Sequence, residues 1–167
     1  MDFGDQIQLS AFVFGKIWNS TFMTAPTDAS REIVVAAGVI EKSGRILISR
    51  RKQGTHLGGL WEFPGGKKQS TETLQACLKR ELHEELGVFC VVGRELGVHR
   101  HTYPEKSVIL HFFSCRLLEG DPKPLDCAEI RWITLDELDG YSFPEADNAF
   151  LSSLKQYGVD GLWFWED

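Results

Sequence analysis

Three glutamates crowd the end of one predicted helix in this 167-residue chain. At about 100° per residue, Glu81, Glu84 and Glu85 share one helix face. Like charges at this spacing weaken a helix by a few tenths of a kcal/mol per pair, and the helix dipole disfavours anions at its C-terminus. A divalent cation relieves the repulsion, because crowded carboxylates are ligands that Mg²⁺ and Mn²⁺ prefer. A solvated acidic face is the alternative for this segment alone.

The helix that must present these glutamates is predicted from residues 74 to 86. Leucines recur at every fourth position, which gives the helix one apolar stripe for packing. Thr73 is typical of an N-cap, and Gly87 is typical of the residue that ends a helix in the left-handed conformation. We therefore expect a helix buried along Leu74, Leu78, Leu82 and Leu86, with Cys77 beside the stripe.

Strands are predicted on both sides of this helix, where β-branched and apolar residues concentrate. A second helix is expected to begin at Pro144 and to end before Gly158, and Thr134–Glu137 resembles a capping box. The expected strands cover residues 33–41, 45–50, 61–63, 88–98, 108–118 and 130–133. This order predicts an α/β fold of the α+β kind, with a mixed β-sheet sandwiched between helices.

Composition indicates an ordinary globular chain of one domain, with 43% hydrophobic and 25% charged residues. No apolar run reaches the roughly 18 residues of a membrane span, so no membrane partner is expected. The net charge of −6 argues against a nucleic-acid polymer as partner and requires local cations if the substrate is an anion. The four cysteines form no CxxC pair, which favours buried thiols in a reducing cytoplasm.

Both ends of the chain are predicted to lie outside the domain at residues 32–157. Residues 1–31 are interpreted as an extension and linker, and 158–167 as an aromatic tail. Asp2 and Asp5 stand where a secretory signal needs positive charge, so a signal peptide is not expected. Two hypotheses remain for residues 1–22: an extension upstream of a start at Met23, or a segment that packs on the domain or a partner.

The residues from Gly66 to Val88 resemble the signature of the Nudix hydrolase family. That signature reads Gly, five residues, Glu, seven residues, Arg-Glu, apolar, any, Glu-Glu, any, Gly, apolar. Every specified position is matched, by Gly66, Glu72, Arg80, Glu81, Leu82, Glu84, Glu85, Gly87 and Val88. The resemblance implies the Nudix fold and a magnesium-dependent enzyme, with manganese as an alternative ion, that cleaves a diphosphate linkage in a nucleotide.

Roles for individual residues follow from this resemblance. It implies that the Gly65 carbonyl and the three glutamates of the predicted helix bind metal, and Glu129 joins them as a further candidate. Gly66 lets the backbone approach metal and phosphates closely. Arg80, with Glu72, is implied to orient the carboxylates. Glu81 and Glu129 are the two candidates for the general base.

The flanking residues resemble the MutT branch of the family. Arg50 and Arg51 end a predicted strand, and the segment Trp-Glu-Phe-Pro-Gly-Gly-Lys follows at residues 61–67. The resemblance implies that Arg51 contacts the phosphates or base, and it places Arg50, Glu62 and Phe63 among the substrate-binding residues. Water would then convert a nucleoside triphosphate to the monophosphate and pyrophosphate, in a monomer or a homodimer.

The choice of base rests on the segment Phe143–Asn148, which resembles the base-reading segment of the MutT branch. Asp147 and Asn148 are its candidates, and an ionised Asp only accepts hydrogen bonds, whereas Asn donates and accepts. Oxidised guanine nucleotides such as 8-oxo-dGTP are the expected substrates, with CTP or a modified dCTP as the alternative. A non-catalytic nucleotide-sensing module is a third hypothesis, although such modules tend to lose carboxylates that this chain retains. Trp61, Phe63 and Phe143 are expected either in the base pocket or in the core.

Overall fold

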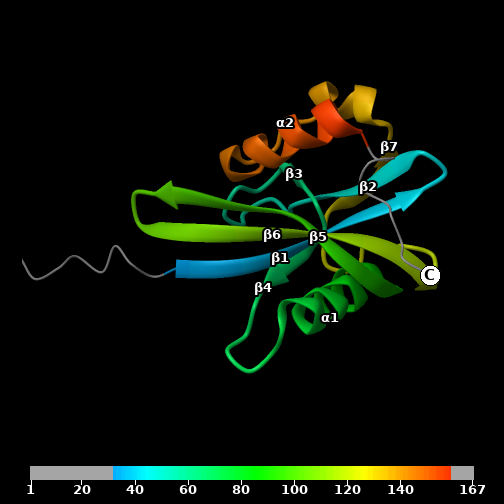
Figure 1. Ribbon diagram of the computed structural model, residues 1–167, viewed down its shortest axis with the longest axis horizontal. Coiled ribbons are helices and arrows are strands. Elements are labelled where there is room, and N and C mark those ends of the chain that lie inside the picture. Colours follow the sequence, from blue (N-terminus) through cyan, green and yellow to red (C-terminus); the bar gives the residue numbers. More distant parts are fainter. Residues whose placement is uncertain (1–31, 159–167) are drawn as a thin grey trace, which may run out of the picture.

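The computed structural model describes residues 32–158, and its predicted sheet lies between helices (Figure 1). Our predictions for the N-terminal extension, the start at Met23 and the aromatic tail fall on residues 1–31 and 159–167, outside the described residues. The strands are β1 (Glu32–Lys42), β2 (Arg45–Arg50), β3 (Trp61–Glu62), β4 (Gly65–Lys67), β5 (Phe89–Tyr103), β6 (Lys106–Glu119) and β7 (Glu129–Ile133). The helices are α1 (Leu74–Leu86) and α2 (Asn148–Tyr157), with 3₁₀ turns η1 (Leu135–Gly140) and η2 (Glu145–Asp147).

Strand β1 is the centre of the sheet. Along one edge it runs antiparallel to β4 and then to β2, and along the other edge it runs parallel to β6. Strand β5 continues the sheet beyond β6, and β7 pairs with β2. The sheet is therefore mixed, and the predicted fold class is confirmed.

Two segments extend further as strands than the sequence indicates. The β5–β6 hairpin continues to Tyr103 and Lys106, because its polar tip still pairs, with the Thr102 and Ser107 hydroxyls 3.2 Å apart. Gly65–Lys67, which lies outside the expected strands, pairs with Val35–Ala37 of β1. Backbone hydrogen bonding, and not side-chain hydropathy, makes these residues strands.

Helix α1 covers one face of the sheet and has the predicted bounds (Figure 1). The Thr73 side chain accepts a hydrogen bond of 3.1 Å from the Ala76 N–H, and Gly87 ends the helix at a φ of 70°. Its stripe of Cys77, Leu78, Leu82 and Leu86 is fully buried against β1, β4 and β5. The predicted N-cap and the end of the helix are confirmed, and so is the stripe, except that Leu74 at its start is only partly buried.

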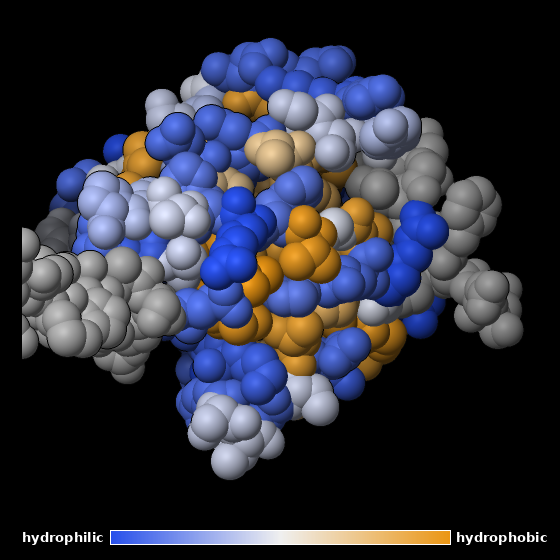
Figure 2. All heavy atoms as spheres, turned by 60° about the vertical axis from the view of Figure 1, so that its left-hand side comes forward, coloured by the Kyte–Doolittle hydropathy of each residue, from blue (hydrophilic) through white to orange (hydrophobic). Residues whose placement is uncertain are grey.

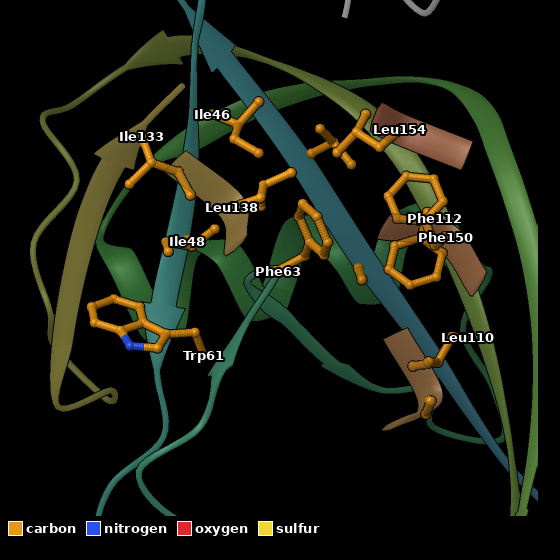
Figure 3. Close-up of a cluster of buried hydrophobic side chains, with 13 residues drawn as sticks. Ile46, Ile48, Trp61, Phe63, Leu110, Phe112, Ile133, Leu138, Phe150 and Leu154 are labelled. Carbon is orange, nitrogen blue, oxygen red and sulfur yellow. The ribbon is translucent and has the colours of Figure 1, made fainter. Parts of the chain in front are cut away.

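Helix α2 covers the opposite face, over a second apolar cluster (Figure 3). There the rings of Phe112 and Phe150 stack 3.8 Å apart, and the Phe63 ring meets both edge-on. The predicted second helix begins as the 3₁₀ turn η2 before the α-helix starts at Asn148. The capping box at Thr134 is confirmed, although the element that it caps is the 3₁₀ turn η1.

On the face seen in Figure 2, hydrophobic side chains reach the surface mainly at the level of the sheet. Figure 2 shows them in the middle band of the molecule, whereas the upper band, where α2 lies in Figure 1, is mostly hydrophilic. Phe89 and Val98 on β5 and Leu118 on β6 are among the exposed large hydrophobic residues. No helix within residues 32–158 is long and apolar enough to cross a membrane.

The stripe on α1 leads to a stability prediction. Leu82→Ala leaves a cavity beneath the helix, because Leu82 is fully buried between α1 and the sheet. The free energy of unfolding, measured by urea titration, should fall by about 2–5 kcal/mol. The matched control is Leu118→Ala, a residue 62% exposed, which should change it by less than about 0.5 kcal/mol. Equal losses in the two variants would contradict the assigned packing.

Candidate active site

The carboxylates of α1 meet the backbone of the glycine pair on β4. A Cβ on Gly66 would lie 2.3 Å from the Glu81 carboxyl carbon, so the strand approaches this closely only with glycine there. At Gly65 a Cβ would lie 2.1 Å from the Ala36 carbonyl oxygen of β1. The Gly65 N–H donates a hydrogen bond of 3.2 Å to Glu85. Two carboxylates are thus held against one bare stretch of backbone.

Arg80 links this helix to the loop that precedes it. Its guanidinium donates two hydrogen bonds to Glu72, at 3.2 and 2.7 Å, and a third of 2.6 Å to Glu81. A longer contact of 3.3 Å reaches Glu84, and the Lys67 carbonyl accepts another of 3.3 Å. The Arg80 hydrogen bonds lower the pKa of Glu72 to about 2. The orienting role predicted for Arg80 and Glu72 agrees with this geometry.

The three glutamates of α1 have different surroundings. Glu84 is exposed, with 56% of its side chain accessible, and its one described partner is Arg80. Glu85 is mostly enclosed, and burial, followed by the nearby charge of Glu62, raises its pKa to about 8. Glu81 lies about one turn before both of them on the helix, with 17% of its side chain accessible. The ends of Glu81 and Glu85 therefore face the glycines, whereas Glu84 borders solvent.

The donors present here fit a hard divalent cation. Within residues 32–158, no three His, Cys, Asp or Glu side chains converge to enclose a metal ion. Mg²⁺ does not need such an enclosure, since it is usually held by one or two carboxylates while water and substrate phosphates complete its octahedral shell. Glu81 and Glu85 beside exposed glycine backbone provide an oxygen donor set of this kind, and they lack the thiolates and imidazoles typical of zinc.

A cleft extends from the glycines toward the turn η2 and has two adjoining chambers. The carboxylate chamber, of about 350 Å³, is lined by Gly65, Gly66, Phe63, Glu81 and Glu85. The apolar chamber, of about 130 Å³, is walled largely by aliphatic and aromatic side chains. Six residues border both chambers: Val35, Arg51, Glu62, Lys67, Leu110 and Asp147. The two chambers together form a continuous path from the carboxylates to an apolar recess.

Charged groups are concentrated where the two chambers meet. Arg51 donates a hydrogen bond of 2.6 Å to Glu62 and another of 2.8 Å to the His56 carbonyl. Burial raises the pKa of Glu62 despite this partner. Asp147 is 6% exposed, and burial, followed by the charge of Glu62, raises its pKa to about 7. One cation thus faces two buried carboxyl groups.

Among the predicted site residues, Glu72 and Glu84 do not line this cleft but are tied to Glu81 through Arg80, which also lies outside its lining. Three others lie elsewhere. Arg50 contacts the Gly59 carbonyl and the Glu129 carboxylate, because successive residues at a strand end point to opposite sides and only Arg51 faces the cleft. Glu129 sits opposite Arg50 in the β2–β7 register and bonds Arg131 at 2.6 Å. Asn148 borders a separate hollow with Leu138, on the far side of η2 from the cleft.

The aromatic residues divide between cleft and core. Phe63 contributes to the wall of the carboxylate chamber and to the core, whereas Trp61 packs edge-on against Tyr141 and Phe143 packs against Phe63. Tyr103 and Lys106, at the tip of the β5–β6 hairpin, line the apolar chamber although the sequence did not single them out. The only sequence signal near these two residues is the polar turn at Pro104, which indicates a loop between two strands. It does not indicate where that loop lies in the fold.

The fold and the site define a hydrolase class, and comparison with known proteins identifies it. The model of the NUDIX domain matches residues 35–153, so the chain belongs to the Nudix family, whose hydrolases generally need a divalent metal. It is 32% identical over 117 residues to an 8-oxo-dGTP diphosphatase of Buchnera aphidicola, covering 68% of this chain and 94% of that protein. The resemblance deduced from residues 66–88 is thereby confirmed.

Two further relatives agree with this assignment. A CTP pyrophosphohydrolase of Escherichia coli is 31% identical over 122 residues, which cover 73% of this chain and 90% of that protein. The crystal structure of a MutT protein from Methanosarcina mazei superposes with a TM-score of 0.68 at 27% identity, covering 75% of this chain and 94% of that one. The two enzyme relatives are thus named for nucleotides with different bases, an oxidised guanine in one and cytosine in the other.

The contact between Gly66 and Glu81 leads to a second prediction. Gly66→Ala should push the Glu81 carboxylate out of place, and a displacement of about 1 Å is enough to slow hydrolysis by about 100-fold. The rate of cation-dependent nucleotide hydrolysis is the measurement. Gly140→Ala is the matched control, since a Cβ there meets nothing within 4 Å. Unchanged turnover in Gly66→Ala would contradict the importance of this close approach.

Proposed function

We propose that this chain is a magnesium-dependent nucleoside triphosphate pyrophosphohydrolase, which converts a nucleoside triphosphate and water to the monophosphate and pyrophosphate. The observation that carries the proposal is the continuous cleft, in which two glutamates and a glycine pair adjoin an apolar recess. A polyphosphate fits beside the carboxylates once cations are present, and a base fits the recess. The names of the two enzyme relatives support the same reaction.

The acidic chain needs local positive charge to hold a triphosphate. Arg51 and Lys67 border both chambers, and Lys106 borders the apolar one. We propose that Arg51 contacts the nucleotide, with Glu62 holding the guanidinium in place. These cations compensate locally for the net charge of −6.

The catalytic roles are assigned to residues of α1. We propose Glu84, Glu85 and the Gly65 carbonyl as metal ligands together with Glu81. A bound divalent cation would neutralise the phosphates and polarise the attacked phosphorus. Glu81 is our proposed general base, because it lines the carboxylate chamber, whereas Glu129 does not border that chamber. It takes a proton from the attacking water as the new P–O bond forms and pyrophosphate leaves.

Asp147 is our proposed base-reading residue. Its carboxyl group is buried where the apolar chamber meets the charged groups, and its raised pKa keeps it largely protonated below about pH 7. A protonated carboxyl group donates one hydrogen bond and accepts others, as an Asn side chain does. This removes the objection that an aspartate here would only accept. Oxidised guanine nucleotides are the leading substrates, with CTP or a modified dCTP second.

A comparison of substrates tests the function. Purified protein with Mg²⁺ should release pyrophosphate from at least one of 8-oxo-dGTP, dGTP, CTP and dCTP, and the ranking of kcat/KM identifies the preferred base. Glu81→Gln should retain the fold and lose activity by at least about 100-fold. Hydrolysis of none of the four by the wild-type protein would contradict the proposal.

The buried carboxyl group of Asp147 gives a pH-dependent prediction. Its pKa is raised from 3.8 to about 7, so between these pH values the folded state keeps a proton that the unfolded state has released. Ionising this buried carboxyl group therefore costs stability, and the cost grows as the pH rises through this range. Asp147→Asn removes that cost, and the free energy of unfolding at pH 8 should rise by about 1–3 kcal/mol. The gain should shrink as the pH falls from 7 toward 4. The charged or titratable groups around Asp147 are Arg51, His56, Glu62, Lys67, Glu81, Glu85, Tyr103, Lys106 and Glu145.

Urea unfolding at pH 5.5 and pH 8 measures this difference. The exposed Asp121→Asn is the matched control and should show no such change between the two pH values. In parallel, Asp147→Asn should alter the ranking of bases more than the dependence on Mg²⁺. A gain of equal size at both pH values would contradict the raised pKa, and an unaltered ranking would remove Asp147 from the base pocket.

A further inference from the structure

The cleft continues beyond the apolar chamber into a further cavity, the lysine hollow. This hollow, of about 540 Å³, is bordered by Lys67, Lys68 and Lys106 and by the start of β1. It adjoins the apolar chamber, because Ile33, Lys67 and Lys106 line both. The tip of the β5–β6 hairpin lies beside the start of β1 and forms another wall (Figure 1). The cleft thus runs from the carboxylates, past the apolar recess, to a group of lysines.

The positive charge of these three lysines is not compensated by ion pairs. Within residues 32–158, none of their ammonium groups is ion-paired with a carboxylate. Most other cations in this part of the chain are paired, as Arg51 is with Glu62. In a protein with a net charge of −6, a concentration of unpaired lysines beside the cleft indicates a site for an anion.

Two glutamates also border the lysine hollow, and neither cancels the charge of the lysines. Glu32 is held by Arg100 at 2.6 Å, so its charge already has a partner. Glu105 is exposed at the tip of the hairpin, where water and salt screen it. The excess charge facing the hollow is therefore positive.

The lysines are fixed relative to the catalytic carboxylates, because two of them continue strand β4. The N–H of Lys68, the residue after β4, donates a hydrogen bond of 2.9 Å to the Val34 carbonyl of β1. The next N–H, of Gln69, donates one of 2.8 Å to Glu72. Gly66, which lies against Glu81, is two residues before Lys68, or roughly 7 Å along the strand. One anchored segment therefore sets the distance between the carboxylates and the lysine hollow.

We propose that the lysine hollow binds a second phosphate group of the substrate, carried on the 3′ hydroxyl of its ribose. The proposal rests on the proposed function, since it places the 5′ phosphates at the carboxylates and the base in the apolar chamber. The ribose joins these two parts and so lies where the two chambers meet. Lys67 borders both chambers and the hollow, which brings the hollow within reach of the ribose.

The substrate class is then a nucleotide phosphorylated on both sides of its ribose. The second phosphate is either a free 3′ phosphate or the phosphodiester to a second nucleotide. Both present the same anionic oxygens to the lysines, and ammonium groups bind phosphate through charge-assisted hydrogen bonds.

Calorimetry with Mg²⁺ present tests the inference independently of turnover. The ligands are dGMP and 2′-deoxyguanosine 3′,5′-bisphosphate, neither of which has a diphosphate linkage to cut. The wild-type protein should bind the bisphosphate about tenfold more tightly. In Lys68→Gln this advantage should fall to about threefold or less. Raising NaCl from about 0.05 to about 0.5 M should reduce it too, because salt screens accessible charges. The corresponding cytosine nucleotides cover the alternative base.

The matched control is Lys42→Gln, at an exposed lysine on the opposite end of β1. It removes the same charge far from the lysine hollow and should retain the tenfold advantage. Equal affinity of the wild-type protein for the two ligands would overturn the inference. An unchanged advantage in Lys68→Gln, or an equal loss in Lys42→Gln, would overturn it as well.

A third ligand separates the two sources of the second phosphate. The dinucleotide pdGpdT carries the phosphodiester, and the ligand with the larger advantage lost in Lys68→Gln identifies the source. If this advantage is found but the wild-type protein hydrolyses no triphosphate, only the proposed function fails. If triphosphates are hydrolysed and neither ligand binds more tightly than dGMP, only the inference fails.

Discussion

The close approach of strand β4 to helix α1 is the constraint on which the site depends. At Gly66 the strand backbone runs so near the Glu81 carboxyl group that no side chain fits between them. The opposite side of the same short strand is pressed against β1, where a Cβ on Gly65 would meet the Ala36 carbonyl. The leucine stripe fixes the height of α1 above the sheet. The carboxylates are therefore held in place by packing, and not by their mutual interactions, which are repulsive.

Charge is arranged to tolerate that repulsion. Arg80 binds Glu72 through two hydrogen bonds and Glu81 through a third, so one guanidinium neutralises part of the acidic face. Arg51 is similarly tied to Glu62 where the two chambers of the cleft meet. Bidentate and charge-assisted hydrogen bonds of this kind also restrict orientation. Each arginine thereby serves as both a counter-charge and a fixed point, in a protein whose overall charge is negative.

The sequence predicted the helix of the site almost completely, because its signals are local. The leucine spacing, Thr73 and Gly87 act within a few residues of one another, and α1 has the expected bounds. At Gly66 the sequence predicted a close approach of the backbone to metal and phosphates, and the approach to the Glu81 carboxylate that the structure shows was not predicted. Residues outside this segment were harder to assign. Arg50 and Arg51 are adjacent, and only the orientation of the strand end decides which one faces the cleft.

Contacts between segments that are distant in the sequence were not predicted, because the signals in the sequence are local. Tyr103 and Asp147 are brought together by a hairpin and a turn whose relative position no local pattern encodes. Asn148 follows Asp147 directly, but the start of α2 directs it to another hollow. The place of Glu129 in the chain made it a candidate metal ligand and general base, whereas its register opposite Arg50 keeps it out of the cleft.

The parallel pairing of β1 with β6 has a consequence for how the protein folds. The register joins Glu32 to Ser107 and Ile40 to Cys115, so the central contact of the sheet closes a very long loop. Loops of this kind carry a high entropic cost early in folding, and contacts distant in sequence slow the search for the native state. A nascent chain that has emerged only as far as Gly87 already contains the whole glutamate signature. The recess for the base is still missing at that stage, because β6 and η2 have not yet emerged.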